Sequence, residues 1–197
     1  MHRTLAATTG VVATLGILLQ GYNVGEAMGT YAAAARRMSM FFTIWTNTTL
    51  AIVMLGAAIA PQGPFAWRRV QCVLLACITL VGLVFYTVLG GGHADTTSDA
   101  VAQFTLHAIT PALALATFLT APHTRLPWRA ILWGLVPPAV YGPVLLARGL
   151  FADEWPYFFL NYNSLGLIPF IQWSIGLIAA FLVFTALFVA LERALSR

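Results

Sequence analysis

Thr43 and His107 are two side chains of this sequence that could together carry out nucleophilic acyl chemistry. A hydroxyl is a weak nucleophile at its own pKa, but a neutral imidazole nitrogen within hydrogen-bond reach takes its proton as it attacks. An apolar environment favours the neutral imidazole that such a base requires. Asn47, four residues after Thr43, could donate to the oxyanion or orient the histidine. These three residues form the candidate catalytic group.

The segments that must position these residues are too apolar for a protein that is surrounded by water. Of the 197 residues, 60% are hydrophobic and only 8% are charged, whereas a soluble domain has about 25% charged residues. So few charges cannot coat a water-facing surface, and no stretch is left for a separate soluble domain of about 50 residues. The composition therefore predicts an integral membrane protein with a single domain over residues 1–197.

Six apolar stretches are each long enough to cross a bilayer as a helix, which takes about 20 residues. The expected helices cover residues 4–22, 40–60, 70–90, 101–121, 130–147 and 167–191. Pro137 and Pro138 predict a kink in the fifth helix. The first stretch also fits a secretory signal peptide, but its length and the apolar chain after it favour a retained helix. The predicted fold class is an all-α bundle of six transmembrane helices.

The arginines predict the orientation of the bundle, because positive residues stay on the cytoplasmic side. With both termini in the cytoplasm, seven of the ten arginines fall inside, and Arg36, Arg37 and Arg148 fall outside. The arginines are scattered in ones and twos, which indicates topology rather than nucleic acid binding. The absence of lysine beside abundant alanine and arginine points to a GC-rich bacterial genome, and thus to a bacterial plasma membrane.

In this topology, polar side chains gather in the outer half of the bundle. Polar groups inside a membrane usually face the bundle interior or a cavity, so these residues are candidates for substrate contact. They are Thr46, Tyr86, Gln103, Thr110, Tyr141 and Gln172. Purely structural roles stay open, because threonine often bonds its own backbone and amide side chains often join helices. His107 differs from the others as the one ionisable side chain expected deep in any of the six segments.

Residues 149–166 form a loop with many aromatic residues at the predicted outer surface. Trp155, Tyr157 and Phe159 are further candidates for substrate contact. Aromatic side chains also collect at membrane interfaces as a belt, and this interpretation competes with that of a lid which rests on an outer cavity and admits lipid tails.

Metal and cofactor chemistry is not expected. The four histidines are scattered over different depths, and the sequence contains no HExxH motif, no CxxC motif and no paired carboxylates. Gly90, Gly91 and Gly92 indicate a turn or hinge rather than a phosphate-binding loop. Cys72 and Cys77 share one apolar segment and are interpreted as packing residues.

Three short stretches bear on family membership: Ser39–Asn47 (SMFFTIWTN), Leu106–Pro111 (LHAITP) and Trp155–Leu160 (WPYFFL). In order and spacing they resemble the bacterial Pr-six-Pr branch of the androgen-induced-gene and androgen-dependent TFPI-regulating protein family. Animal members of that family hydrolyse fatty acid esters of hydroxy fatty acids with a threonine nucleophile and a histidine. The resemblance thus implies Thr43 as nucleophile and His107 as base. Pro156 precedes Tyr157 here, whereas the family pattern has proline after the tyrosine.

The leading hypothesis is a membrane-embedded lipid esterase whose partner is a membrane lipid or fatty acyl ester substrate. The first alternative is a lipid-binding or small-molecule carrier protein, in which His107 would only bond to a ligand. A second alternative is a subunit that packs against another protein and has no polar cavity of its own.

Overall fold

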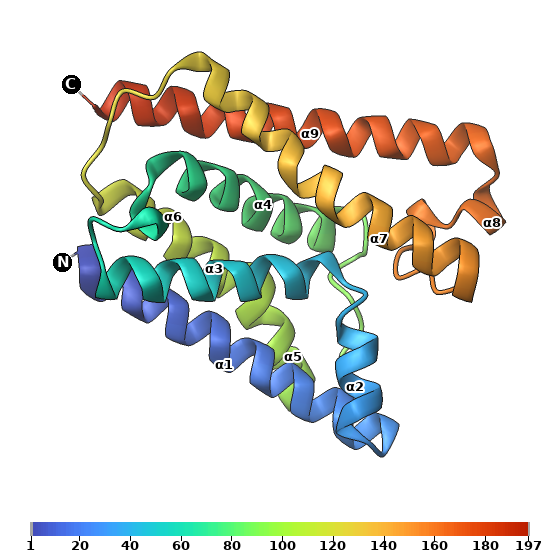
Figure 1. The fold of residues 1–197 in the computed structure, drawn as a ribbon. Helices are drawn as coiled ribbons and strands as arrows, with labels where there is room; N and C mark the ends of the chain where they lie inside the picture. The colour runs from blue at the N-terminus through green and yellow to red at the C-terminus, as the bar shows by residue number, and fades with distance from the viewer. Residues whose placement is uncertain (1, 197) are drawn as a thin grey trace.

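The computed structural model describes residues 2–196, and within that range the protein is helical and contains no strand. Six helical segments of these residues are long and apolar enough to cross a membrane, which confirms the predicted all-α, six-span class. They are α1 (His2–Met28), α3 (Phe42–Ile59), α4 (Arg68–Thr87), Thr97–Thr120, Trp128–Ala152 and α9 (Leu167–Leu195). The beginning of α1 and the end of α9 lie at the same end of the bundle (Figure 1).

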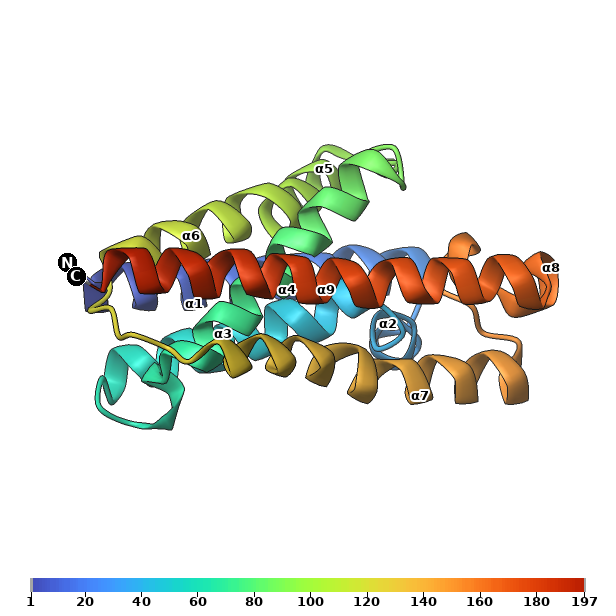
Figure 2. The same cartoon turned by 90° about the horizontal axis from the view of Figure 1, so that it is seen from above.

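Shorter elements join these helices. At the end of the bundle away from the termini, α2 (Tyr31–Met38) runs across the long helices, and Figure 2 shows it nearly end-on. The Thr30 hydroxyl caps α2 by accepting a bond from the N–H of Ala33. The short helical turns η1 (Pro64–Ala66), η4 (Phe158–Leu160) and α8 (Tyr162–Leu165) complete the connections.

The fourth span is not the regular helix predicted over 101–121. It consists of α5 (Thr97–Phe104), a π-helical turn η2 (Thr105–Ile109) and α6 (Thr110–Thr120). Pro111 has no N–H to give to the carbonyl of His107, so α-helical bonding fails there. The N–H and the hydroxyl of Thr110 both bond to the carbonyl of Thr105 instead. His107 therefore lies in an irregular turn.

The fifth span also differs from its prediction. It begins as a 3₁₀ helix, η3 (Trp128–Leu135), and continues as α7 (Val136–Ala152), five residues beyond the predicted end. Pro137 and Pro138 lie in the first turn of α7, where a missing N–H loses no helical partner. The irregularity expected at these prolines is a change of helix type just before them.

The first and sixth helices are longer than predicted, because backbone hydrogen bonds continue past the apolar windows. α1 extends through Glu26 to Met28 rather than ending near 22, and α9 extends through Glu192 to Leu195 rather than ending at 191. The second and third spans match their predicted ranges to within two or three residues, at 42–59 and 68–87.

The core lies along α4, which carries more buried residues than any other helix described. Figure 1 shows α4 between α3 and α9. Cys72 and Ile78 of α4 are fully buried, as are Leu50 of α3 and Val189 of α9. Cys72 and Cys77 are both buried free thiols, in keeping with a packing role.

Candidate active site

The first turn of α3 and the π turn bring Thr43 and His107 together. The Thr43 hydroxyl lies 3.4 Å from Nε2 of His107. On the other side of the ring, Nδ1 lies 2.8 Å from the carbonyl oxygen of Gln103. Because a carbonyl only accepts hydrogen bonds, Nδ1 carries the proton, and Nε2 of the neutral ring presents its lone pair to Thr43. This is the tautomer that a base for Thr43 requires.

Two neighbours on α4 hold His107 in this position. The ring of Phe85 stacks on the imidazole with the ring centres 3.7 Å apart and an angle of 12° between the planes. A Cβ at Gly82 would lie 2.6 Å from the carbonyl oxygen of His107, so α4 can approach the π turn only because residue 82 has no side chain. The position of the candidate base thus depends on the packing of a different span.

Asn47 links the first turn of α3 to the π turn through hydrogen bonds. It is fully buried, and its side-chain amide donates to the carbonyl of Thr43 at 2.9 Å and to the carbonyl of Leu106 at 3.4 Å. Both contacts use the NH₂ group, which ties α3 to the π turn. To donate to an oxyanion, as predicted, Asn47 would need its side-chain N–H groups, and these already bond the two carbonyls.

A cavity of about 380 Å³ lies beside Thr43, between α3, α4, α7 and α9. This volume falls in the range of about 300–1,000 Å³ that is usual for small-molecule sites. Most of its lining is aliphatic or aromatic, and no charged side chain of the described chain faces it. The lining residues with a polar side-chain atom are Thr43, Tyr141, Tyr157 and Ser174. Such a cavity suits a hydrocarbon chain whose polar group lies at Thr43.

The aromatic loop closes one end of this cavity. Tyr157 and Phe159 line it, are buried, and stack on each other with ring centres 5.2 Å apart. The Tyr157 hydroxyl accepts a bond of 2.9 Å from the N–H of Phe42, at the start of α3. Tyr141, on α7, donates its hydroxyl to the carbonyl of Met40 at 2.5 Å. Tyr157 and Phe159 are therefore packed into the bundle, whereas Phe158 and Tyr162 of the same loop are exposed.

Several residues predicted to contact substrate do not line this cavity. Tyr86 and Gln172 are exposed. Thr110 is fully buried and bonds the Thr105 carbonyl, while the side chain of Gln103 donates to the carbonyl of His93.

Trp155 and Thr46 lie next to the cavity but not in its wall. Trp155 packs against the backbone of Gly149, where a Cβ would lie 2.3 Å from the indole ring. Thr46 lines a second groove of about 310 Å³ between α3, α4 and the fifth span. Phe42 and Tyr141 line both spaces and separate them.

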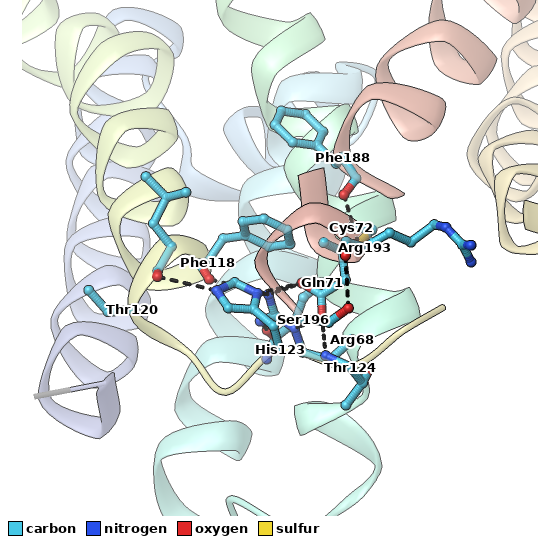
Figure 3. A network of polar contacts seen from close by, with 12 residues as sticks. Arg68, Gln71, Cys72, Phe118, Thr120, His123, Thr124, Phe188, Arg193 and Ser196 are labelled. Atoms are coloured by element: carbon cyan, nitrogen blue, oxygen red, sulfur yellow. Dashed lines mark hydrogen bonds and ion pairs between the residues drawn. The ribbon is translucent and has the colours of Figure 1, made fainter. Parts of the chain in front are cut away.

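A buried ionic network at the other end of the bundle was missed by the sequence analysis. Glu192 of α9 is fully buried, and its Oε2 lies 2.5 Å from Nη2 of Arg68 and 2.7 Å from Nδ1 of His123. Figure 3 shows Arg68, His123 and Thr124 converging where α4 begins. Arg68 begins α4 and Glu192 lies three residues before the end of α9, so both fall just outside the spans predicted at 70–90 and 167–191. The adjacent charges Glu192 and Arg193 within the otherwise apolar stretch VALERAL were a signal that could have revealed the network.

In chemical terms, the site combines a hydroxyl, a base whose lone pair faces it, and an apolar cavity that the hydroxyl residue lines. A backbone carbonyl orients the histidine in place of the carboxylate that a full triad would use. Within residues 2–196, no three His, Cys, Asp or Glu side chains are grouped closely enough to hold a metal ion. No protein family, curated protein or solved structure matched the chain when it was compared with them, so its function rests on these contacts.

Proposed function

We propose that the protein is a membrane-embedded hydrolase of lipid esters, with Thr43 as nucleophile and His107 as base. The observation that carries the proposal is the contact between the Thr43 hydroxyl and Nε2 of His107 at the polar edge of an apolar cavity. The bond from Nδ1 to the Gln103 carbonyl supports it, since it selects the reactive tautomer.

In the proposed reaction, the acyl chain of the substrate occupies the cavity and its ester carbonyl lies at Thr43. The Thr43 oxygen attacks the carbonyl carbon while its proton passes to Nε2 of His107. The tetrahedral intermediate collapses, the bond to the alkoxy oxygen breaks, and His107 gives its proton to the departing alcohol. Water, deprotonated by His107 in turn, then attacks the acyl carbon, the bond from that carbon to the Thr43 oxygen breaks, and His107 returns the proton to Thr43 as the fatty acid leaves.

The proposal extends to family and topology. Thr43 and His107 are the residues that the resemblance to the Pr-six-Pr branch implies, and we propose that the chain is a bacterial member. We also propose that both termini lie in the cytoplasm of a bacterial plasma membrane, which would put the aromatic loop and the cavity in the outer leaflet. The distribution of the arginines and the position of both termini at one end of the bundle support this orientation.

Labelling with a fluorophosphonate probe tests the nucleophile and the base. The wild type should be labelled covalently, whereas Thr43→Ala and His107→Ala should lose labelling and keep their thermal unfolding temperature in detergent micelles. Thr48→Ala is the matched control, because Thr48 lies on the same helix but is exposed, and it should label like the wild type. Undiminished labelling of Thr43→Ala would exclude Thr43 as the nucleophile.

A lipid carrier is the second candidate function, and the chemistry of the cavity favours it. The lining has few polar atoms, and His107 has no carboxylate partner among the described residues. Mass spectrometry of lipids that co-purify with the protein separates the two functions. A carrier would retain an intact lipid in the wild type and in Thr43→Ala alike, and would hydrolyse no ester. A hydrolase would release free fatty acid in the wild type alone.

A further inference from the structure

Ester hydrolysis at Thr43 would place a negative charge on the carbonyl oxygen of the substrate, and a hydrogen-bond donor must be free to meet it. Three of the four polar side chains that line the cavity direct their protons at other groups. Ser174 donates to the carbonyl of Phe170 at 2.8 Å, and Tyr141 donates to the carbonyl of Met40. The proton of Thr43 is directed at His107. Of the polar residues in the lining, Tyr157 is left.

Tyr157 uses the acceptor side of its hydroxyl but not the donor side. Its oxygen accepts from the N–H of Phe42 at 2.9 Å, and within residues 2–196 no backbone carbonyl or carboxylate takes its proton. The side chain is only 8% exposed, and its hydroxyl lies beside those of Thr43 and Tyr141, whose own protons are directed at His107 and at the Met40 carbonyl. Asn47, the donor expected from the sequence, has its amide committed to the carbonyls of Thr43 and Leu106. The Tyr157 proton is therefore available where the charge would develop.

We infer that Tyr157 is a further catalytic residue, which donates its O–H to the oxyanion formed when Thr43 attacks an ester. This inference rests on the proposed hydrolase function. As the new bond between the Thr43 oxygen and the carbonyl carbon forms, the carbonyl π electrons move to the carbonyl oxygen. The Tyr157 hydroxyl bonds that oxygen without transferring its proton. When the bond to the alkoxy oxygen breaks, the carbonyl re-forms and the hydrogen bond weakens again.

The surroundings of Tyr157 suit this role. Burial raises the pKa of Tyr157 to about 12, although the Phe42 N–H, the side chain and N–H of Thr43 and the Tyr141 hydroxyl act in the opposite direction. The phenol therefore stays protonated, as a donor must. The N–H groups at the start of α3 also polarise the hydroxyl and fix its direction, so little reorganisation is needed as charge develops.

Hydrolysis of p-nitrophenyl octanoate by the full-length protein in detergent micelles tests the inference. Tyr157→Phe should lower kcat by about 10²–10³-fold, the loss typical of one oxyanion donor, and leave KM within about threefold of the wild type. Tyr162→Phe should leave both constants unchanged, because Tyr162 lies outside the cavity lining. Tyr141→Phe is matched in burial, at 8% exposed, and should lower kcat by less than tenfold.

The outcomes separate this inference from the proposed function. If Tyr157→Phe keeps kcat within threefold of the wild type while Thr43→Ala is inactive, the role of Tyr157 is refuted and the hydrolase remains. Equal kcat losses in Tyr157→Phe and Tyr141→Phe would also refute it, because they would reflect packing alone. Full activity of Thr43→Ala would refute both proposals.

Should Tyr157→Phe not fold, 3,5-difluorotyrosine at position 157 keeps the shape of the ring and makes the phenol more acidic. The alkaline limit of kcat should then move to lower pH, because activity would be lost when the donor ionises. An alkaline limit identical to that of the wild type would overturn the inference.

Discussion

Buried polar groups are hydrogen-bonded tightly at one end of the bundle and loosely towards the other. At the end that holds the termini, the four hydrogen bonds that residues 2–196 make to the Glu192 carboxylate are short. Its Oε1 accepts from Arg68 Nε at 2.8 Å and Thr124 N at 2.7 Å, and its Oε2 accepts from Arg68 Nη2 at 2.5 Å and His123 Nδ1 at 2.7 Å. Nearer the other end, Thr43 and His107 lie 3.4 Å apart, Thr43 lines a cavity, and no backbone carbonyl or carboxylate of residues 2–196 accepts the Tyr157 proton.

This difference separates polar groups that stabilise the fold from polar groups that can act on a ligand. A buried ion pair with all its hydrogen bonds made leaves no group free to bind anything else, but breaking it exposes an uncompensated charge. Buried polar groups that are bonded only loosely, next to a cavity, gain most from a ligand that completes their bonding. The ionic network therefore joins α4, α9 and the loop after α6, and the Thr43 site is where chemistry is proposed.

Replacing His107 or His123, one histidine towards each end of the bundle, should give the largest difference in activity and stability. His107→Ala should lower kcat by about 10²–10⁴-fold, because it removes the base, and should change the unfolding temperature little. His123→Ala should do the reverse, because it removes a bond to Glu192 far from the cavity. Ester hydrolysis and thermal unfolding, measured on the same preparations, check this. Similar activity losses in both variants would show that the two ends are not independent.

Glu192→Gln should produce the next largest effect, on stability. It leaves Arg68 buried without its counter-charge, which costs about 3–5 kcal/mol of unfolding free energy. Glu154→Gln is the matched control, because the pair of Glu154 with Arg36 is exposed on the arginine side and worth at most about 1 kcal/mol. Denaturant unfolding in micelles measures both changes. Equal stability of the two variants would contradict the role assigned to the network.

Gly82→Ala should affect both activity and stability, because its Cβ would press on the carbonyl of His107. Overpacking of this kind costs about 1–3 kcal/mol, and a displaced imidazole should lower kcat with little change in KM. Gly176→Ala is the control, since a Cβ there meets nothing within 4 Å and alanine favours a helix. A fully active Gly82→Ala enzyme would show that His107 does not depend on α4 for its position.

Gly142→Leu should have the smallest effect, a change in substrate preference. Gly142 lines the cavity, and a Cβ there would enter open space. A leucine should shorten the acyl chain that fits and shift kcat/KM from long to short p-nitrophenyl esters by about tenfold. Gly176→Leu, outside the cavity, should not change the preference. An unchanged chain-length profile in Gly142→Leu would place the acyl chain elsewhere.

Much of the architecture could be predicted from the sequence, because the lengths of apolar segments are local properties. The all-α class and the six spans follow from hydrophobic stretches that a bilayer accepts only as helices. Thr43 and His107 could be selected from their residue types and expected depth, while their contact had to come from the structure. The ends of α1 and α9 were missed because helical backbone bonding does not stop where polar side chains begin.

The sequence by itself determined the number of spans, their helical character and the residue types available for chemistry. Tertiary structure alone decided which groups meet: Arg68 with Glu192 across 124 residues, and the Tyr157 hydroxyl with the start of α3 across 115. The same holds for the position of His107, which requires a glycine on another helix. The physical reason is that a span forms from its own backbone bonds and its own transfer into lipid, whereas a site forms from contacts between helices that no single segment encodes.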